Sequence, residues 1–284
     1  PSLTMIYKTP NDEAVEYVKY EIIVDSTTCL TGLATGQGSS SVCVCDAPGL
    51  TQTIRPTKDE DPMAGISTFD LVLISKHVLG TDPLNSPYKI IAADVNKSNS
   101  VTTFDIVELR KLILLILGAL PASDSYRFID INQSFSNPAN PFASVPFQEQ
   151  IDFQYPPSGT VAEFVAIKVG DVNWSYQCCP AQRPGADPIA DHAAGKAFPL
   201  AYTSSTVQTA EGQSSLDLPV FPAENLTAVA WQLALQYDTS RWRCTGIRAG
   251  DTDPQQFLFA WHEPVAGELR FVGFDAAGTT TQWP

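Results

Sequence analysis

The sequence predicts a multidomain, mainly β protein with one small α-helical module. Segments near both ends alternate apolar and polar residues, which is the period of a half-buried strand. Between them, residues 66–79 and 101–114 repeat one phrase with helical spacing, thirty-five positions apart. Finally, 284 residues with 44% hydrophobic and 10% aromatic side chains supply more than one core.

Residues 1–57 are expected to form the end of a β-sandwich, because strand-like alternation there is broken by Gly/Ser-rich turns. Cys29 can pair with Cys43 or with Cys45 in an oxidising compartment. Either disulfide closes a loop of about fifteen residues and contributes on the order of 3 kcal/mol. Buried free thiols are the alternative. Zinc is disfavoured, because the six cysteines include no C-x-x-C pair and only three histidines are present.

The repeated phrase predicts two helices. Thr68 and Thr103 stand where N-caps are expected, and Gly80 is the expected C-cap of the first helix. The second helix is expected to run from Phe104 to Gly118.

The segment before the second helix spaces its oxygen-bearing residues as a calcium loop does. Asp94, Asn96 and Ser98 stand at loop positions 1, 3 and 5. Ser100 offers its carbonyl at position 7, and Asp105 closes the loop at position 12. Ca²⁺ is a hard cation that takes oxygen ligands, so we expect one calcium ion here. The alternative is an Asx-rich turn that caps the helix without a metal.

The segment before the first helix is a degenerate version of this loop. Counting back from Asp70 places Asp59 at position 1 and Asp61 at position 3, but Met63 stands at position 5. The Gly65 carbonyl falls at position 7. Two interpretations stay open, a second calcium with altered geometry and a loop that only caps the helix.

The remaining segments follow in order. Residues 121–160 lack periodicity and are expected to wrap the helix pair as an irregular, aromatic-rich extension. A strand-like phrase then leads into Asp171 and Asn173, which resemble the opening of another loop. No helix or closing acid follows them, so we interpret them as structural. Residues 177–197 are expected to be a linker and residues 198–284 an incomplete β-sandwich.

The loop–helix, linker, loop–helix order resembles a dockerin type I module, whose fold packs two such units in pseudo-twofold symmetry around two calcium ions. The tail resembles a cohesin-like β-sandwich, the family that receives dockerins. The wider text is similar to large multidomain surface proteins of Bacteroidota secreted by the type IX system. The phrases that carry these resemblances are residues 65–77, 85–89, 92–96 and 164–173 for the dockerin, and residues 229–238 and 241–247 for the cohesin.

These resemblances imply a sandwich end at 1–57, a dockerin-like domain at 58–176, a linker at 177–197 and a partial cohesin-like sandwich at 198–284. Dockerins commonly present small hydroxylated residues at loop positions 10 and 11, whereas Phe69 and Phe104 stand at position 11 here. We expect these two phenyl rings to be buried under the wrapping extension.

The net charge excludes some classes of function. A charge of −14 with only 17 Lys and Arg residues and no basic cluster disfavours nucleic-acid binding. The longest apolar run, residues 112–120, has about half the length of a membrane span. We expect the chain to be a fragment of a longer protein, with any export signal or anchor outside it.

No arrangement of residues predicts catalysis. His77, His192 and His262 form no Ser-His-Asp or Cys-His pattern. We therefore expect a non-enzymatic, extracellular structural or adhesive protein of the cell surface, part of a large adhesin or filament rigidified by calcium. Its partners would be other domains or copies of the same surface protein. The alternatives are an assembly connector that binds a cohesin-like domain, and an accessory region of a secreted polysaccharide-degrading enzyme.

Overall fold

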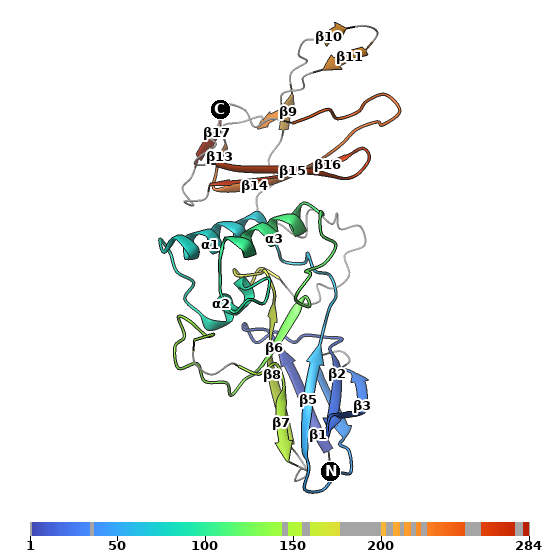
Figure 1. The fold of residues 1–284 in the computed structure, drawn as a ribbon, viewed down its shortest axis with the longest axis vertical. Helices are drawn as coiled ribbons and strands as arrows, with labels where there is room; N and C mark the ends of the chain where they lie inside the picture. Colours follow the sequence, from blue (N-terminus) through green and yellow to red (C-terminus); the bar gives the residue numbers. More distant parts are fainter. Residues whose placement is uncertain are drawn as a thin grey trace.

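A computed structural model gives the fold of most of the chain, and the ribbon is shown in Figure 1. The residues it describes are 2–34, 37–143, 147–154, 160–176, 200–202, 207–210, 213–216, 220–222, 226–247, 257–275 and 281–283. The expected linker at 177–197 lies outside the described residues. The fold is mainly β with three short helices, which confirms the predicted class at that level.

Two four-stranded sheets form the sandwich near the N-terminus. The first has the order β4-β1-β8-β6, and the second has the order β3-β2-β5-β7. Their side chains share one core, which makes them the two layers of one sandwich. The strands are β1 Ser2–Lys8, β2 Lys19–Val24, β3 Thr27–Leu33, β4 Ser39–Cys43, β5 Thr51–Thr57, β6 Tyr126–Asp130, β7 Ile151–Gln154 and β8 Thr160–Lys168.

Residues 1–57 supply only part of this sandwich. Strand β8 pairs in parallel with β1, from Leu3 opposite Thr160 to Lys8 opposite Val165. Strand β6 extends the same sheet beside β8, and β7 pairs with β5 in the other sheet. The segment expected to be an irregular extension therefore contributes two strands, β6 and β7, and the strand-like phrase after it forms β8. The helices lie between β5 and β6 in the chain.

From Phe164 onward, strand β8 is buried on both of its faces. Phe164 and Ala166 belong to the core between the two sheets, whereas Val165 and Ile167 belong to the core under the helices. This two-sided burial explains why β8 reads as a continuous apolar run without alternation. The sandwich and the helices are thus built on opposite faces of one strand.

A disulfide joins Cys29 and Cys45 near the open edges of the sandwich. It closes a separation of 16 residues and resolves the choice between Cys43 and Cys45. Cys43 is a free, exposed thiol.

The helices are α1 Thr68–Leu79, α2 Pro87–Ala93 and α3 Thr103–Ile113. The N-caps are Ser67 and Thr102, one residue before the expected Thr68 and Thr103. Each cap forms a reciprocal capping box with the aspartate three residues later. Gly80 is the left-handed C-cap that was predicted.

Two helix predictions differ from the structure. Helix α3 ends at Ile113 rather than near Gly118, because Leu114 is its C-cap and Leu115 takes a positive φ of 57°. Helix α2 was not predicted from the sequence. Pro87 is its first helical residue. The N–H at that position makes no hydrogen bond within a helix, so proline, which has no N–H, is well tolerated there.

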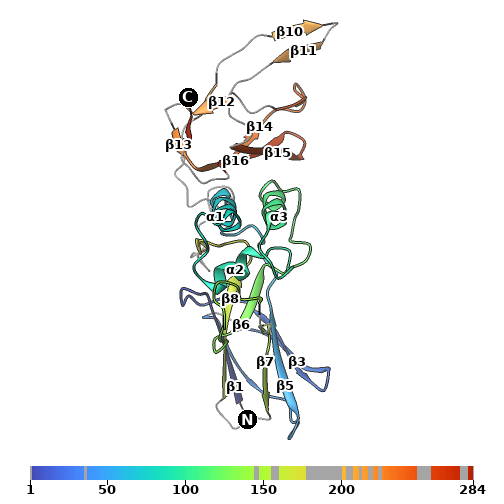
Figure 2. The ribbon, with the colours of Figure 1, turned by 60° about the vertical axis from the view of Figure 1, so that its left-hand side comes forward.

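Helices α1 and α3 form a layer between the sandwich and a third sheet (Figures 1 and 2). This sheet has the order β14-β16-β15 and packs on α1. Its strands are β14 Ala230–Gln236, β15 Phe257–Val265 and β16 Glu268–Asp275. The other C-terminal strands pair two by two: β9 Leu200–Tyr202 with β12 Val220–Pro222, β10 Val207–Ala210 with β11 Gln213–Leu216, and β13 Leu226–Ala228 with β17 Thr281–Trp283.

The expected burial of the two phenylalanines is wrong. Phe69 is 47% exposed and Phe104 is 72% exposed. The aromatic side chains of the extension pack elsewhere, since Phe135 contacts Tyr88 of α2 and also contacts Phe147. Among the helices of the described residues, none is long and apolar enough to cross a membrane.

Candidate functional site

The loop between α2 and α3 gathers the oxygen atoms that the sequence predicted. One Asp94 carboxylate oxygen accepts the Ser98 N–H at 2.8 Å, and the other accepts the Asn99 N–H at 3.1 Å. The Asn96 side-chain oxygen accepts the same Ser98 N–H at 3.0 Å. The Ser98 hydroxyl donates to the Ser100 carbonyl at 3.1 Å. Asp94, Asn96, Ser98 and Ser100 therefore face one point.

Asp105 closes this loop from the first turn of α3. Its Oδ1 accepts the Asn96 N–H at 3.2 Å, and its Oδ2 accepts the Thr102 N–H at 2.8 Å. Both carboxylates of the loop, Asp94 and Asp105, are fully buried. Lys97 and Asn99 take positive φ values of 57° and 61°, which let the loop turn sharply enough for its oxygens to converge. We name these residues the continuous cluster: Asp94, Asn96, Ser98, Ser100 and Asp105.

Asp59 and Asp61 are engaged away from Asp70. The Asp59 carboxylate accepts the Ser125 N–H at 3.0 Å and the Ser125 hydroxyl at 2.8 Å. The Asp61 carbonyl accepts a hydrogen bond from Lys168 Nζ at 2.7 Å. Met63 packs against the helical core. These residues hold the approach to α1 in place, and other groups face Asp70.

The groups that face Asp70 come from the segment after β8. Asp70 Oδ1 accepts the Val172 N–H at 3.0 Å, across a separation of 102 residues. The Ser175 hydroxyl donates to the Gly65 carbonyl at 2.9 Å. Both contacts tie the chain just after β8 to the start of α1.

Within that segment, the hydrogen bonds copy those of the continuous cluster. Asp171 accepts the Ser175 N–H at 3.1 Å and the Tyr176 N–H at 2.9 Å. The Asn173 side-chain oxygen accepts the Ser175 N–H at 2.7 Å. Asp70 accepts the Ser67 N–H at 2.9 Å, as Asp105 accepts that of Thr102. We name the second set the split cluster: Gly65, Asp70, Asp171, Asn173 and Ser175.

The sequence shows the same correspondence once the two segments are joined. Residues 171–176 read DVNWSY and residues 94–99 read DVNKSN. Residues 65–70 read GISTFD and residues 100–105 read SVTTFD. The first loop is therefore divided between two distant segments rather than degenerate. The repeated D-V-N-x-S phrase is the signal that identifies Asp171, Asn173 and Ser175, and counting back along the contiguous chain passes over it.

Both clusters hold carboxylates that burial makes hard to ionise. Burial, and secondarily the nearby Asp171 carboxylate, raise the pKa of Asp70 to about 7. Burial also raises the pKa of Asp171 and of Asp94. When the pKa of an acid is higher in the folded than in the unfolded chain, the free energy of unfolding falls as the pH rises from the unfolded pKa to the folded pKa. For Asp70 this range runs from about 4 to about 7. A cation between these carboxylates offsets that cost.

The donor sets fit calcium. Each cluster offers two carboxylates, one amide oxygen, one hydroxyl and one backbone carbonyl, all of which are hard oxygen ligands. In the part of the chain that the structure describes, no three His, Cys, Asp or Glu side chains gather as a metal-binding group. The named residues of both clusters offer oxygen atoms only, with none of the nitrogen and sulfur ligands typical of zinc.

Gly65 lies where the two segments of the split cluster meet. Its φ is +76°, and a Cβ added there would lie 2.5 Å from the Tyr176 Cβ and 2.9 Å from Asp171 Oδ2. We expect Gly65→Ala to destabilise the protein by about 2–4 kcal/mol, because left-handed strain adds to a clash with fixed atoms. Urea unfolding measures this loss.

Gly80→Ala is the matched control. Gly80 has a similar φ of +70°, but nothing lies within 4 Å of its added Cβ. Gly80→Ala should lower the free energy of unfolding only by the backbone strain, about 1 kcal/mol. Equal losses for the two variants would show that the close approach at Gly65 is not needed.

No family model, curated protein or solved structure matches this chain. The dockerin and cohesin resemblances therefore remain proposals. They rest on the loop residues, the repeated helix phrase and the shared hydrogen bonds of the two clusters.

Proposed function

We propose that this chain belongs to a non-enzymatic extracellular structural protein and that two calcium ions staple its sandwich to its helical layer. The observation that carries the proposal is the repetition of one donor set and one hydrogen-bond pattern in two clusters, although one cluster is divided between distant segments. The continuous cluster would hold one ion and the split cluster the other. A bound Ca²⁺ supplies positive charge that binds several oxygen atoms at once, and so fixes residues that otherwise move independently.

The position of the split cluster gives the staple its structural effect. Residues 171–175 follow directly after β8 of the sandwich, whereas Gly65 and Asp70 begin α1. The Gly170 N–H also donates to the Ala92 carbonyl of α2 at 2.9 Å. An ion at the split cluster would therefore set the angle between the sandwich and the helices.

An extracellular location is supported by two independent features. The Cys29–Cys45 disulfide is typical of oxidising compartments. The net charge of −14 suits surroundings rich in divalent cations. We infer a surface-located adhesin or filament, in line with the resemblance to type IX-secreted proteins, whose partners are neighbouring domains or copies.

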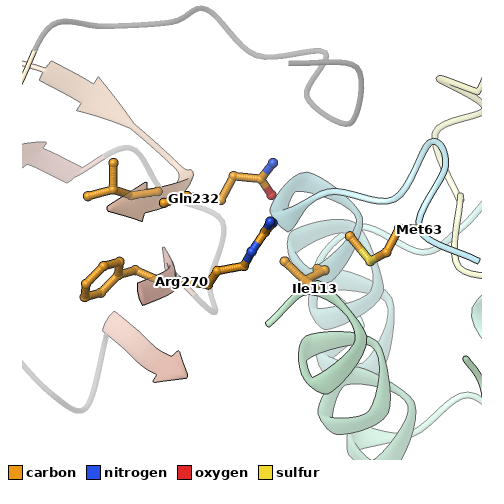
Figure 3. A pocket seen from close by; sticks show the side chains of 7 residues that line it. Met63, Ile113, Gln232 and Arg270 are labelled. Carbon is orange, nitrogen blue, oxygen red and sulfur yellow. The ribbon is translucent and has the colours of Figure 1, made fainter. Parts of the chain in front are cut away.

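A second candidate function, an assembly connector, is supported by the contact between α1 and the third sheet. Val272 and Phe274 of β16 are buried in the same core as the helices. Figure 3 shows a small cavity at this contact, where Gln232 and Arg270 of the sheet face Met63 and Ile113. Helix α1 and the third sheet thus meet within one chain, as the proposed dockerin-like and cohesin-like parts of a connector would. Mixing separately expressed residues 1–176 and 198–284 in size-exclusion chromatography tests whether they associate without the covalent link.

Calcium removal tests the proposed staple. Native mass spectrometry of the full chain should find two Ca²⁺ ions, and EDTA should remove both. At calcium concentrations a thousandfold above Kd, each ion stabilises the fold by about 4 kcal/mol. Thermal unfolding in EDTA should therefore occur well below that in calcium, and protease should cleave near residues 65–70 and 171–176 first.

Three substitutions assign the ions to the clusters. Asp105→Asn should remove the ion of the continuous cluster, and Asp171→Asn that of the split cluster, so each variant keeps one ion. Asp82→Asn, in the exposed loop after α1, is the control and should keep both. Unchanged thermal stability and protease resistance in EDTA would refute the proposal.

A further inference from the structure

A buried arginine stands beside the continuous cluster. Arg127 of β6 is 3% exposed, and its Nη1 lies 3.4 Å from Asp94 Oδ2. Its guanidinium also packs over the Phe147 ring, 5.1 Å from the ring centre. A fixed positive charge thus approaches one of the two carboxylates that would bind the metal.

Glu149 holds this arginine more closely than Asp94 does. Its Oε1 lies 2.9 Å from Arg127 Nε and 2.8 Å from Arg127 Nη2. Its other oxygen lies 3.2 Å from Lys97 Nζ, and Lys97 belongs to the loop itself. Glu149, which is not a cluster residue, therefore neutralises part of the positive charge of Arg127 and Lys97 next to this loop.

The split cluster is arranged differently. Its neighbouring cation is Lys168, which is 6% exposed and donates to the Asp61 carbonyl at 2.7 Å. Lys168 also lies over the Tyr126 ring, 5.1 Å from its centre. None of the described carboxylates makes a salt bridge with Lys168 that would correspond to the Arg127–Glu149 pair.

We propose that Glu149 sets the calcium affinity of the continuous cluster by neutralising part of the positive charge that Arg127 and Lys97 hold beside it. The inference rests on the proposed calcium binding. Without Glu149, Arg127 keeps only its contact with Asp94, and the uncompensated charge of both cations repels a divalent ion. Without Arg127, the carboxylate of Glu149 adds negative charge near the ion. Glu149 is thus a positioning residue, whose effect travels through Arg127 and reaches one of the two clusters.

Calcium titrations of the full chain test this, by isothermal calorimetry at about 0.15 M salt. Glu149→Gln should weaken calcium binding at the continuous cluster roughly tenfold and leave the split cluster unchanged. The effect is moderate because the Coulomb interaction between the proposed ion and nearby charges is reduced by the effective dielectric constant near a protein surface. Arg127→Gln should strengthen binding at the continuous cluster. The double variant should return affinity toward that of the unaltered chain.

Glu163→Gln is the matched control. The Glu163 side chain is 30% exposed and pairs with Lys8 at 3.6 Å, whereas the Glu149 side chain is 31% exposed. Glu163→Gln should leave the calcium affinity of both clusters unchanged. Circular dichroism and thermal unfolding in EDTA, run on every variant, check that each folds and provide a second readout, in which the metal-free chain loses little stability on Glu149→Gln.

Two results overturn the inference. One is an unchanged calcium affinity for Glu149→Gln in a chain that still binds two ions. The other is a double variant that binds as weakly as Glu149→Gln alone, which would make Glu149 a direct ligand. An unaltered chain that binds no calcium would instead refute the proposed function, so the two failures are distinguishable.

Discussion

Phe164→Ala is expected to destabilise the sandwich by about 3–5 kcal/mol, because it removes a fully buried ring from the centre of the core. Phe164 stacks on Tyr7 with ring centres 5.6 Å apart, and Tyr7 in turn meets Phe128 edge to face at 5.9 Å. Loss of the ring leaves a cavity that three strands of one sheet cannot close, because β1, β8 and β6 hold one another in register. Urea unfolding followed by tyrosine and tryptophan fluorescence measures the loss.

Val161→Ala, on the same strand, is the control for this substitution. Val161 is 57% exposed, so its loss should change the free energy of unfolding by less than about 0.5 kcal/mol. Comparable losses at the two positions would contradict the proposed core. The Phe164→Ala loss should also persist in EDTA, because Phe164 belongs to neither of the two proposed calcium clusters.

Val272→Asp is expected to detach the third sheet from the helices. Val272 is 1% exposed in the core formed by β16 and the helical layer, where a carboxylate would find no partner among the apolar side chains. Burying an unpaired carboxylate costs several kcal/mol, which directly opposes the packing of this sheet on the helices. Small-angle X-ray scattering should show a larger radius of gyration, and limited proteolysis should separate the C-terminal strands first.

Val265→Asp provides the same change at a position that is 60% exposed on β15. It should leave the dimensions of the protein unchanged. Both variants should keep the two proposed calcium ions, because neither residue belongs to a cluster. A compact Val272→Asp protein would show that the contact between sheet and helices does not depend on this core.

Local signals were sufficient to predict helices α1 and α3, although not α2 or the end of α3. The T-F-D phrase and Gly80 act within one or two turns of chain, and they mark the start of both helices and the end of α1. The spacing of Asp94 to Asp105 is equally local, and the structure joins these residues by hydrogen bonds in one loop. The N-caps lie one residue earlier than predicted, because Ser67 and Thr102, rather than Thr68 and Thr103, complete the capping boxes.

Long-range pairings were not predicted. The pairing of β8 with β1 joins residues about 157 positions apart, and nothing within either strand encodes that choice. The split cluster also joins distant segments, because the Val172 N–H, just after β8, donates to Asp70 of α1. Counting along the contiguous chain therefore led to Asp59 and Asp61, which instead hold Ser125 and Lys168.

The division of the first loop affects how well the denatured chain could bind a calcium ion with these residues. Twelve contiguous residues can still collect around a calcium ion after unfolding, and that residual binding reduces how much the ion favours the native state. The split cluster must first join segments 102 residues apart, and loop closure over such a length costs on the order of 4–5 kcal/mol of chain entropy. The two proposed ions, with the same ligands, would therefore be unequal in their thermodynamic linkage to folding. An ion at the split cluster would bind only the folded chain, and its full affinity would contribute to the stability of the junction.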